Sequence, residues 1–255
     1  MWTANRVERS PPREVSSGTI STMSEPCPRI LPGRPVVLVM GRLPEAGRVK
    51  TRLGHRYGQT AALELHTAFL RDTLDHAVAA ATSLGGRAVF AYEGDGPPSR
   101  HGLAEVAAFP QSPGDLGRRQ SAAQAALLDQ DAGSVITIGS DSPTLPASFF
   151  EEAWSRRETA DVVVAPATDG GYVLIALTRR HADLYTGLEW GTPRVMRTLA
   201  ERALELGLTL HCMAAWYDID DEAGLQRLCR EIAADPGVAP HSASALKALS
   251  PDLIP

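Results

Sequence analysis

Three cationic side chains stand close together in one loop of this chain. Arg48, Lys50 and Arg52 fall within five residues, after a turn that begins at Gly41 and contains a proline and a second glycine. Backbone N–H groups and cations beside the end of a strand suit a polyphosphate. The spacing is not that of a Walker A loop, in which the lysine directly follows the second glycine. A basic loop that only faces solvent is the alternative interpretation.

Three aspartates form a second group. Asp141 follows the predicted strand 134–138, and Asp218 and Asp220 follow the predicted strand 209–213. The last two alternate, so they would face one side of an extended segment. Carboxylates together with substrate phosphates are the usual ligands of Mg²⁺ in proteins, so this group predicts a metal–polyphosphate site. Alternatively, Asp141 or the serine after it caps the next helix.

A third group, Asp169-Gly170-Gly171-Tyr172, separates two apolar runs. Paired glycines allow a backbone to approach a ligand closely. An Asp-Gly pair between apolar runs is also the usual signal of a tight hairpin, which needs no function. The two interpretations are compatible.

Short apolar runs alternate with helical stretches along the chain, which predicts an α/β sandwich with a mostly parallel sheet. In such sheets ligands bind at the carboxyl ends of the strands, which is where the three groups fall. The predicted strands are 36–40, 87–92, 134–138, 161–165, 172–177 and 209–213. The predicted helices are 59–83, a short one near 101–106, 115–129, 147–158, 193–206 and 221–234.

Other residues that attract notice receive structural interpretations. Asp221 and Glu222 stand at a predicted helix start, where the helix dipole favours acids. The histidines show no metal-ligand spacing, so helix-surface or loop positions are predicted for them. Trp190 is predicted to be a core anchor, with a place in a binding pocket as the alternative.

Composition and charge exclude several classes of protein. The chain has 255 residues and a formal net charge of −5, which disfavours a general nucleic-acid binder. No apolar run approaches the roughly 18 residues of a membrane span. The three cysteines have no CxxC spacing, which disfavours a disulfide framework and a zinc site and suits a reducing cytoplasm.

The two ends of the chain differ from its middle. Residues 1–34 are rich in Pro, Ser and Arg without apolar periodicity, which predicts a disordered tail, and Met23 is an alternative start. Residues 35–234 are predicted to form a single domain, and residues 235–255 a loosely attached tail.

Four motifs in order resemble one bacterial family, the GT-A-fold transferases labelled "rSAM/selenodomain-associated transferase 1". They are Gly47-Arg-Val-Lys-Thr-Arg-Leu53, Gly114-Asp-Leu-Gly117, Gly139-Ser-Asp-Ser-Pro-Thr-Leu-Pro146 and Asp169-Gly-Gly-Tyr172. The resemblance spans about residues 35–228. It implies a GT-A or nucleotide-diphospho-sugar transferase-like fold, a three-layer α/β sandwich with a mostly parallel central sheet.

A more distant resemblance links the chain to the guanylyltransferases that activate phospholactate or phosphoenolpyruvate. It rests on Lys50-Thr51-Arg52-Leu53 and on the segment that begins at Asp218. In that family the corresponding carboxylates hold the metal ions, which implies Asp141, Asp218 and Asp220 as ligands here. Three positions depart from the pattern: Asp221-Glu222 replace Thr-Pro, and Gly224 replaces an acid. The segment that wraps the nucleoside corresponds to 114–120, which implies Gly114, Asp115 and Gln120 as nucleotide contacts without fixing the base.

Together these features predict a metal-dependent nucleotidyltransferase with Mg²⁺ or Mn²⁺ as cofactor. A small acceptor with a phosphate or carboxylate would attack the α-phosphate of an NTP, and catalysis would rest on positioning and electrostatics. Lys50, Asp141 and Asp169 are the predicted catalytic residues. Gly41, Arg48, Lys50, Thr51 and Arg52 would bind phosphates, and Asp169, Gly170, Gly171 and Tyr172 would face the acceptor.

Two alternatives stay open. A glycosyltransferase with a nucleotide-sugar donor would use the same fold, and Asp169 would then be the acceptor base. Many such enzymes carry Asp-x-Asp at a central strand end, whereas Ser140-Asp-Ser142 has a single acid, which favours nucleotidyl transfer. A non-catalytic nucleotide-binding protein is the second alternative.

Overall fold

A seven-stranded sheet forms the centre of the computed structural model, which describes residues 27–103 and 105–249. The strands lie in the order β3-β2-β1-β4-β6-β5-β7. Only β6 runs antiparallel to its neighbours, so the sheet is mostly parallel. The strands are β1 (Pro35–Arg42), β2 (Arg87–Glu93), β3 (Ala107–Pro110), β4 (Ser134–Gly139), β5 (Val162–Pro166), β6 (Tyr172–Leu177) and β7 (Leu210–Cys212).

The continuous apolar run of β1 follows from its central position. Val37 and Val39 face one layer of the core, whereas Val36 and Leu38 face the other, and all four are buried. A strand covered by helices on both faces has no polar side, which explains the absence of alternation in its sequence.

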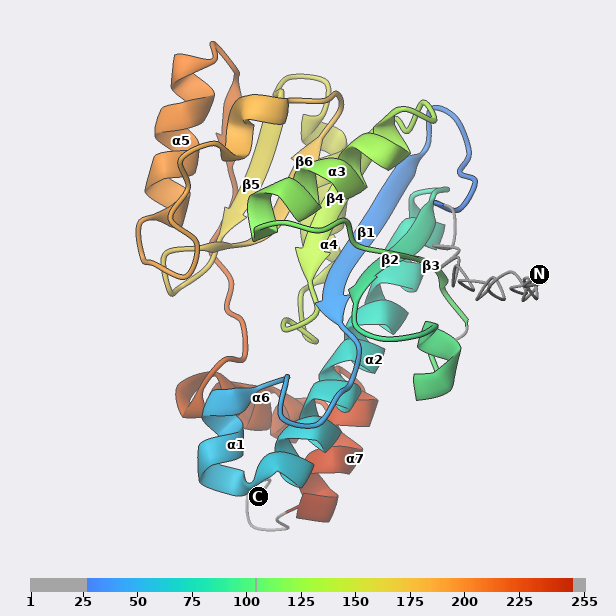
Figure 1. Ribbon diagram of the computed structural model, residues 1–255, viewed down its shortest axis with the longest axis vertical. Helices are drawn as coiled ribbons and strands as arrows, with labels where there is room; N and C mark the ends of the chain where they lie inside the picture. The colour runs from blue at the N-terminus through green and yellow to red at the C-terminus, as the bar shows by residue number, and fades with distance from the viewer. Residues whose placement is uncertain (1–26, 104, 250–255) are drawn as a thin grey trace, which may run out of the picture.

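Helices cover both faces of the sheet and complete three layers (Figure 1). Helices α2 (Gln59–Ser83) and α4 (Ala147–Arg156) pack on one face, and α3 (Leu116–Leu128) and α5 (Val195–Glu205) on the other. Two 3-10 turns, η1 (Pro98–His101) and η2 (Ala182–Tyr185), join these elements. No helix within the described residues has the length and apolar character needed to cross a membrane.

Three further helices form a cluster at the carboxyl end of the sheet. They are α1 (Thr51–Tyr57), α6 (Glu222–Ala234) and α7 (Pro240–Leu249), and they pack with the first half of α2 (Figure 1). This helical cluster has its own core, which includes Leu53, Phe69, Leu228 and Leu246. The parallel strands therefore end facing a second packed unit, and a cleft lies between the two.

The prediction of a loosely attached segment after residue 234 differs from the structure. Helix α7 occupies residues 240–249 of that segment, and the buried Asp72 of α2 binds its first turn. The carboxylate of Asp72 accepts hydrogen bonds from the backbone N–H groups of His241 (3.0 Å) and Ser242 (2.7 Å) and from the Ser242 hydroxyl (2.5 Å). A partner this far away in the sequence leaves no local signal.

Several smaller predictions also differ. Residues 98–101 form a 3-10 turn where a short helix was predicted near 101–106, and neither α1 nor β3 was predicted. Most of the predicted N-terminal tail lies outside the described residues, but its last part packs on the core through Cys27 and Ile30. The fold class itself is confirmed: the chain forms a three-layer α/β sandwich with a mostly parallel central sheet.

Candidate active site

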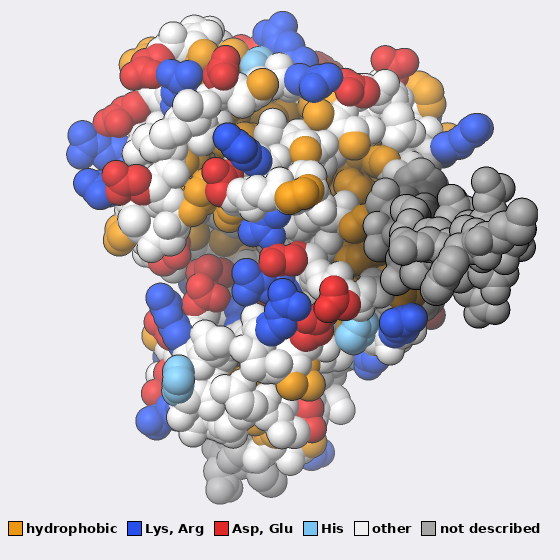
Figure 2. All heavy atoms as spheres, viewed as in Figure 1, with side chains coloured by type: hydrophobic (Ala, Val, Ile, Leu, Met, Phe, Trp, Pro, Cys, Tyr) orange, Lys and Arg blue, Asp and Glu red, His pale blue; other side chains and the backbone are white. Residues whose placement is uncertain are grey.

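A cleft of about 570 Å³ lies between the carboxyl ends of the strands and the helical cluster. Its lining comes from the ends of β1, β4 and β6, the start of α1, helix α3 and the segment 190–195. Figure 2 shows acidic and basic side chains gathered between the two parts of the molecule. All three groups of polar residues that the sequence singled out contribute to this one cleft.

A lysine and two aspartates form the most charged point of the cleft. The Nζ atom of Lys50 lies 2.9 Å from Oδ1 of Asp141 and 2.9 Å from Oδ1 of Asp220. The Lys50 side chain is only 4% exposed, whereas the two carboxylates are 34% and 50% exposed. The ammonium therefore lies on the inner side, and the carboxylates open toward the cleft. We call these three residues the Lys–Asp centre.

Lys50 and Asp141 hold each other in the ionised form. Burial alone would lower the pKa of Lys50, but the two carboxylates outweigh it and raise that pKa above its usual value. Burial would raise the pKa of Asp141, but Lys50 and, to a smaller extent, His66 hold it below its usual value. The centre thus consists of two carboxylates that share one internal cation.

Backbone contacts bring Asp220 to Asp141 across 79 positions of the sequence. The carbonyl of Asp141 accepts a hydrogen bond from the N–H of Ile219 (2.9 Å), and the Ser142 hydroxyl donates to the carbonyl of Tyr217 (2.9 Å). The segment after β7 is thereby fixed against the loop after β4. Neither Asp141 nor Ser142 caps α4, whose N-cap is Pro146 without a side-chain bond, so that alternative is wrong.

The third predicted metal ligand, Asp218, does not line the cleft. Burial and then the nearby charges of Asp220, Asp169 and Asp141 raise its pKa to about 6. Within the described residues, no three His, Cys, Asp or Glu side chains are arranged to hold a metal ion. Asp141 and Asp220 nonetheless offer what Mg²⁺ takes in nucleotide sites, which is one or two carboxylates plus phosphate oxygens and water. The donor set fits a metal that arrives with phosphates, not a metal held by protein alone.

Asp221 confirms its predicted structural role. Its carboxylate accepts a hydrogen bond from the N–H of Gly224 (3.1 Å) and so caps α6, and Glu222 in the first turn pairs with Arg56 (3.1 Å) on α1. The residue pairs Lys50/Thr51 and Asp220/Asp221 thus stand at the starts of α1 and α6. Helices α1 and α6 of the cluster therefore both begin at the cleft.

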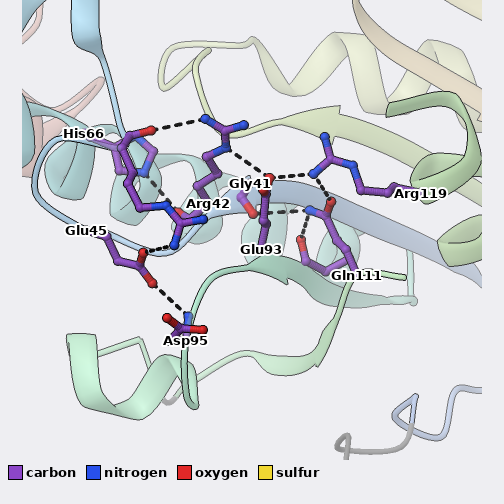
Figure 3. Close-up of polar contacts among 10 residues, drawn as sticks. Gly41, Arg42, Glu45, His66, Glu93, Asp95, Gln111 and Arg119 are labelled. Carbon is purple, nitrogen blue, oxygen red and sulfur yellow. Dashed lines mark hydrogen bonds and ion pairs between the residues drawn. The ribbon is translucent and has the colours of Figure 1, made fainter. Parts of the chain in front are cut away.

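Basic side chains line the wall of the cleft formed by β1, α1 and α3. Arg48, Thr51 and Arg52 lie there, as predicted, but so do Arg42 and Arg119, which the sequence analysis did not single out. Figure 3 shows both of the latter directed at Glu93. Oε2 of Glu93 lies 3.0 Å from Nε of Arg42 and 2.5 Å from a terminal nitrogen of Arg119.

Gln111 braces this wall. Its amide donates hydrogen bonds to the carbonyls of Gly41 (3.2 Å) and Ala91 (2.9 Å), and its Oε1 accepts one from Arg119 (3.1 Å) (Figure 3). Gly41 itself is required, because a Cβ atom there would lie 2.8 Å from Cβ of Ser140. Arg42 lies two residues after the end of the predicted strand 36–40, and this position was a signal that could have identified it.

His66 lies beneath the basic wall and not on a helix surface, so the prediction for this histidine was wrong. It is 3% exposed, and its Nε2 donates to the carbonyl of Arg42 (3.0 Å). Burial lowers its pKa. Its Nδ1 atom is buried without a hydrogen-bond partner. Through this hydrogen bond His66 supports the backbone at the end of β1.

The segment 114–120 contributes less than predicted. Neither Gly114 nor Asp115 lines the cleft, and the Asp115 carboxylate caps α3 by accepting from the N–H of Arg118 (2.8 Å). Gln120 does line the cleft. It accepts a hydrogen bond from the Tyr172 hydroxyl (2.9 Å) and donates one to Tyr185 (3.1 Å). Of the predicted nucleotide contacts in this segment, the structure brings only Gln120 to the site.

The opposite wall comes from the β5–β6 hairpin and the segment 190–195. The hairpin is confirmed by the pairing of Pro166 with Tyr172. Gly170 does not line the cleft: it has a φ of 96°, and a Cβ atom there would lie 2.3 Å from the carbonyl oxygen of Pro193. Glycine is needed at position 170 because the backbone of Pro193 lies so close. Asp169, Gly171 and Tyr172, in contrast, line the cleft.

Trp190 belongs to both the core and the cleft. It packs on the core of α5 and β6, with its ring 6.2 Å from that of Tyr172 in an edge-on arrangement, and it also lines the cleft. Asp169 accepts a hydrogen bond from the N–H of Gly171 (2.8 Å), which fixes its carboxylate at the hairpin. Among the described lining residues from 169 to 195, none is Lys, Arg or His. The two walls therefore differ sharply in charge.

The fold and this cleft define a class: an α/β protein of the nucleotide-diphospho-sugar transferase-like type, with a charged site at the carboxyl end of its sheet. Residues 67–192 match the family described as "Uncharacterized protein conserved in bacteria (DUF2064)". Among curated proteins, none matches this chain.

Solved structures agree with this class. A crystal structure described as a "putative nucleotide-diphospho-sugar transferase" from Desulfovibrio desulfuricans G20 has a TM-score of 0.78 and 27% identity. The match covers 88% of this chain and 97% of that one. It confirms the resemblance to GT-A-fold transferases that the motifs indicate.

Two more distant structures share the fold. The CMP:2-keto-3-deoxy-manno-octonic acid synthetase complexed with CTP has a TM-score of 0.50 and 12% identity, over 79% of this chain and 99% of that one. A cytidylyltransferase from Leptospira borgpetersenii serovar Hardjo-bovis has a TM-score of 0.50 and 11% identity, over 87% and 96%. At these identities the likeness concerns the fold alone.

Proposed function

We propose that this protein is a divalent-metal-dependent transferase that takes a nucleotide as donor and transfers its nucleotidyl group to a small acceptor bearing a phosphate or carboxylate. The observation that carries the proposal is the Lys–Asp centre at the edge of a wall lined by four arginines, Arg42, Arg48, Arg52 and Arg119. Cations beside two partly open carboxylates are what a metal-bound polyphosphate requires. The similar structure from Desulfovibrio desulfuricans, described as a "putative nucleotide-diphospho-sugar transferase", supports a transferase that uses a nucleotide-linked donor.

The chain's own residues have distinct roles in this proposal. The four arginines and Lys50 neutralise the phosphates and fix the α-phosphate in line with the acceptor. Asp141 and Asp220 would hold Mg²⁺ or Mn²⁺, which supplies Lewis-acid stabilisation of the phosphoryl oxygens when bound. Asp169, whose carboxylate accepts a hydrogen bond from the N–H of Gly171, would face the acceptor and orient it through a hydroxyl group of the acceptor. Asp218 assists through its negative charge. The reducing cytoplasm is the location that we propose from the cysteines.

One observation favours glycosyl transfer as a second candidate. The wall from 169 to 195 combines the Asp169 carboxylate with the aromatic rings of Tyr172 and Trp190, and no cation of the described lining residues lies on it. An aromatic face with a carboxylate suits the hydroxyl groups of a sugar better than an anionic acceptor. The metal and the phosphate-binding wall would serve both reactions.

A thermal-shift panel separates the candidates. The purified chain is melted with Mg²⁺ or Mn²⁺ and each common NTP or nucleotide-sugar, beside the Asp141→Asn variant. A ligand at 100 times its dissociation constant stabilises the native state by about 2.7 kcal/mol. We expect a metal-dependent rise in melting temperature with one NTP, absent in the variant.

The other outcomes of the panel also decide between candidates. A rise with nucleotide-sugars alone would replace nucleotidyl by glycosyl transfer. Turnover of a bound nucleotide is measured by assays of phosphate and pyrophosphate release. Binding without such turnover would indicate a non-catalytic nucleotide-binding protein. No stabilisation by any nucleotide in the presence of metal would contradict the proposal. Asp129→Asn is the control variant, because it changes an aspartate that does not line the cleft, and it should keep the stabilisation seen in the wild type.

A further inference from the structure

The Lys–Asp centre holds its cation where a metal would have to bind. One Oδ1 atom from each of Asp141 and Asp220 lies 2.9 Å from Nζ of Lys50. Mg²⁺ binds carboxylate oxygens at about 2.0–2.1 Å. An ion that contacts both of these oxygens would lie within a few ångströms of the ammonium, and two cations at that separation repel strongly. Lys50 and a metal are therefore alternative occupants of the same pair of carboxylates.

The backbone of Lys50 is strained, and the residue stands between two cations that line the cleft. Lys50 has a φ of 44° and a ψ of 47°, the left-handed region that is unfavourable for a residue with a Cβ atom. It stands at the N-cap of α1, at the end of a loop that also contains Gly47 with a φ of 77°. Arg48 in the loop and Arg52 on α1 are exposed and line the cleft. Lys50 lines the same cleft, so phosphates bound by these arginines would lie beside its flexible side chain.

Lysine suits this exchange better than arginine. Only two lysines occur in the whole chain, Lys50 and Lys247, against 23 arginines. An ammonium is a compact charge on a flexible stem with three donors, so it can bridge two carboxylates and then turn to phosphate oxygens. A guanidinium would engage one carboxylate in a planar, two-bond contact and leave it less readily.

We propose that Lys50 is an internal counter-ion of the Lys–Asp centre, which keeps a divalent metal out until the phosphates of the donor draw the ammonium away. The proposal rests on the proposed function for the identity of the phosphates. Metal and nucleotide would then depend on each other, each binding weakly alone and much more tightly with the other. The phosphates draw the Lys50 ammonium away from the carboxylates, and a bound metal then occupies the carboxylate oxygens to which the ammonium would return.

The first test uses metal alone. Mn²⁺ is titrated into the protein without nucleotide, and free Mn²⁺ is counted by electron paramagnetic resonance. We expect Lys50→Met to bind Mn²⁺ at least tenfold more tightly than the wild type. Arg56→Met is the matched control, since it removes a cation of α1 that does not line the cleft and that pairs with Glu222 instead of either carboxylate, and its affinity should stay within twofold of the wild type. Adding Asp220→Asn to Lys50→Met should abolish the gain. Equal or weaker binding by Lys50→Met would overturn the proposal.

The second test needs no variant at the centre, so it stands even where Lys50→Met fails to fold. With ¹⁵N in lysine alone, the chain gives two ammonium signals, and Lys247→Arg, an exposed substitution on α7, assigns them. We expect 10 mM MgCl₂ to leave the Lys50 signal in place, and Mg²⁺ with inorganic tripolyphosphate to shift it. A shift of equal size with MgCl₂ alone, or a static signal while the phosphorus signals report bound tripolyphosphate, would overturn the proposal.

The two proposals fail in different ways. A tenfold gain in Mn²⁺ affinity for Lys50→Met, without any nucleotide binding in the panel, supports the counter-ion and contradicts the donor. Nucleotide binding by the wild type without a gain for Lys50→Met supports the donor and contradicts the counter-ion.

Discussion

At the scale of single residues, the cleft depends on positions where very little room is left. Gly41 lies against Ser140, and Gly170 lies against the backbone of Pro193. The contact between Gly170 and Pro193 lies in the wall that carries Asp169. Next to it, the N–H of Met196 donates a hydrogen bond to the carbonyl of Gly170 (2.9 Å). These backbone contacts, together with the packing of Trp190 against Tyr172, hold the segment 190–195 to the hairpin.

We predict that Gly170→Ala lowers the free energy of unfolding by about 2–4 kcal/mol, since a positive φ and a backbone clash combine. Gly139→Ala is the matched control. Its Cβ atom would meet nothing within 4 Å, so a change within about 0.5 kcal/mol is expected. Urea unfolding followed by tryptophan fluorescence measures both. Similar midpoints for the two variants would show that the segment 190–195 adjusts freely to the hairpin.

At the scale of elements, one carboxylate reinforces the pairing of the short edge strand β7 with β5. Oδ2 of Asp161, just before β5, accepts hydrogen bonds from the N–H (2.9 Å) and the hydroxyl (2.7 Å) of Thr209, just before β7. These bonds, together with that from Arg179, lower the pKa of Asp161 to about 2. The segment that carries Asp220 into the cleft follows β7 directly, so this bond supports the site from a distance.

The lowered pKa predicts a pH dependence of stability. An unfolded Asp has a pKa of about 3.9, so between about pH 4 and pH 2 the unfolded chain binds more protons than the native one. Stability from Asp161 is therefore fully present above about pH 4 and is lost as the pH falls toward 2. We expect Asp161→Asn to cost about 1–2 kcal/mol at pH 7, with about half of that difference left at pH 3.

The measurement is urea unfolding of both proteins at pH 7, 4 and 3. Asp129→Asn is the control, because that carboxylate pairs only with Arg180 at the surface, where the two side chains are 54% and 59% exposed. Its cost should stay within about 0.5 kcal/mol at every pH. A cost for Asp161→Asn that does not change with pH would assign the effect to side-chain shape and not to charge.

At the scale of the whole molecule, the site exists because two packed units meet. The sheet supplies Asp141 and Asp169, while Lys50 and Asp220 lead into α1 and α6 of the helical cluster. That cluster is joined to the sandwich through the long helix α2, and α7 packs along α2 from the other side (Figure 1). A change that destabilises the packing of α7 is therefore expected to destabilise the helical cluster, from which Lys50 and Asp220 reach the cleft.

We predict that Asp72→Ala lowers the free energy of unfolding by about 2–4 kcal/mol, because it leaves the N–H groups of His241 and Ser242 buried without their charged acceptor. Asp75→Ala is the control on the same helix. Its carboxylate is 62% exposed and contacts His241 only, at 3.2 Å, so its cost should stay below about 1 kcal/mol. Chemical denaturation measures both. Equal effects of the two variants would indicate that α7 is held by its apolar contacts alone.

Local patterns determined most of the elements of this protein. The run after Pro35 predicts a strand buried on both faces, the apolar spacing predicts helix 59–83 with the observed bounds, and Asp221 is a helix cap as expected. Motif order indicated the fold class, and the rule that ligands bind at strand ends brought Lys50, Asp141 and Asp169 to one cleft. These features depend on neighbours within a few residues or on a general property of parallel sheets.

Tertiary structure decided what depends on contacts between distant segments. The binding of α7 by Asp72, the burial of His66 under Arg42 and the exclusion of Asp218 from the cleft all arise between segments far apart in the chain. The same is true of Lys50, whose loop reads as a phosphate-binding segment, while its ammonium lies between Asp141 and Asp220. Sequence shows which charges a loop carries, but the partner that neutralises them is chosen by packing, since electrostatic energy depends on distance and burial in space.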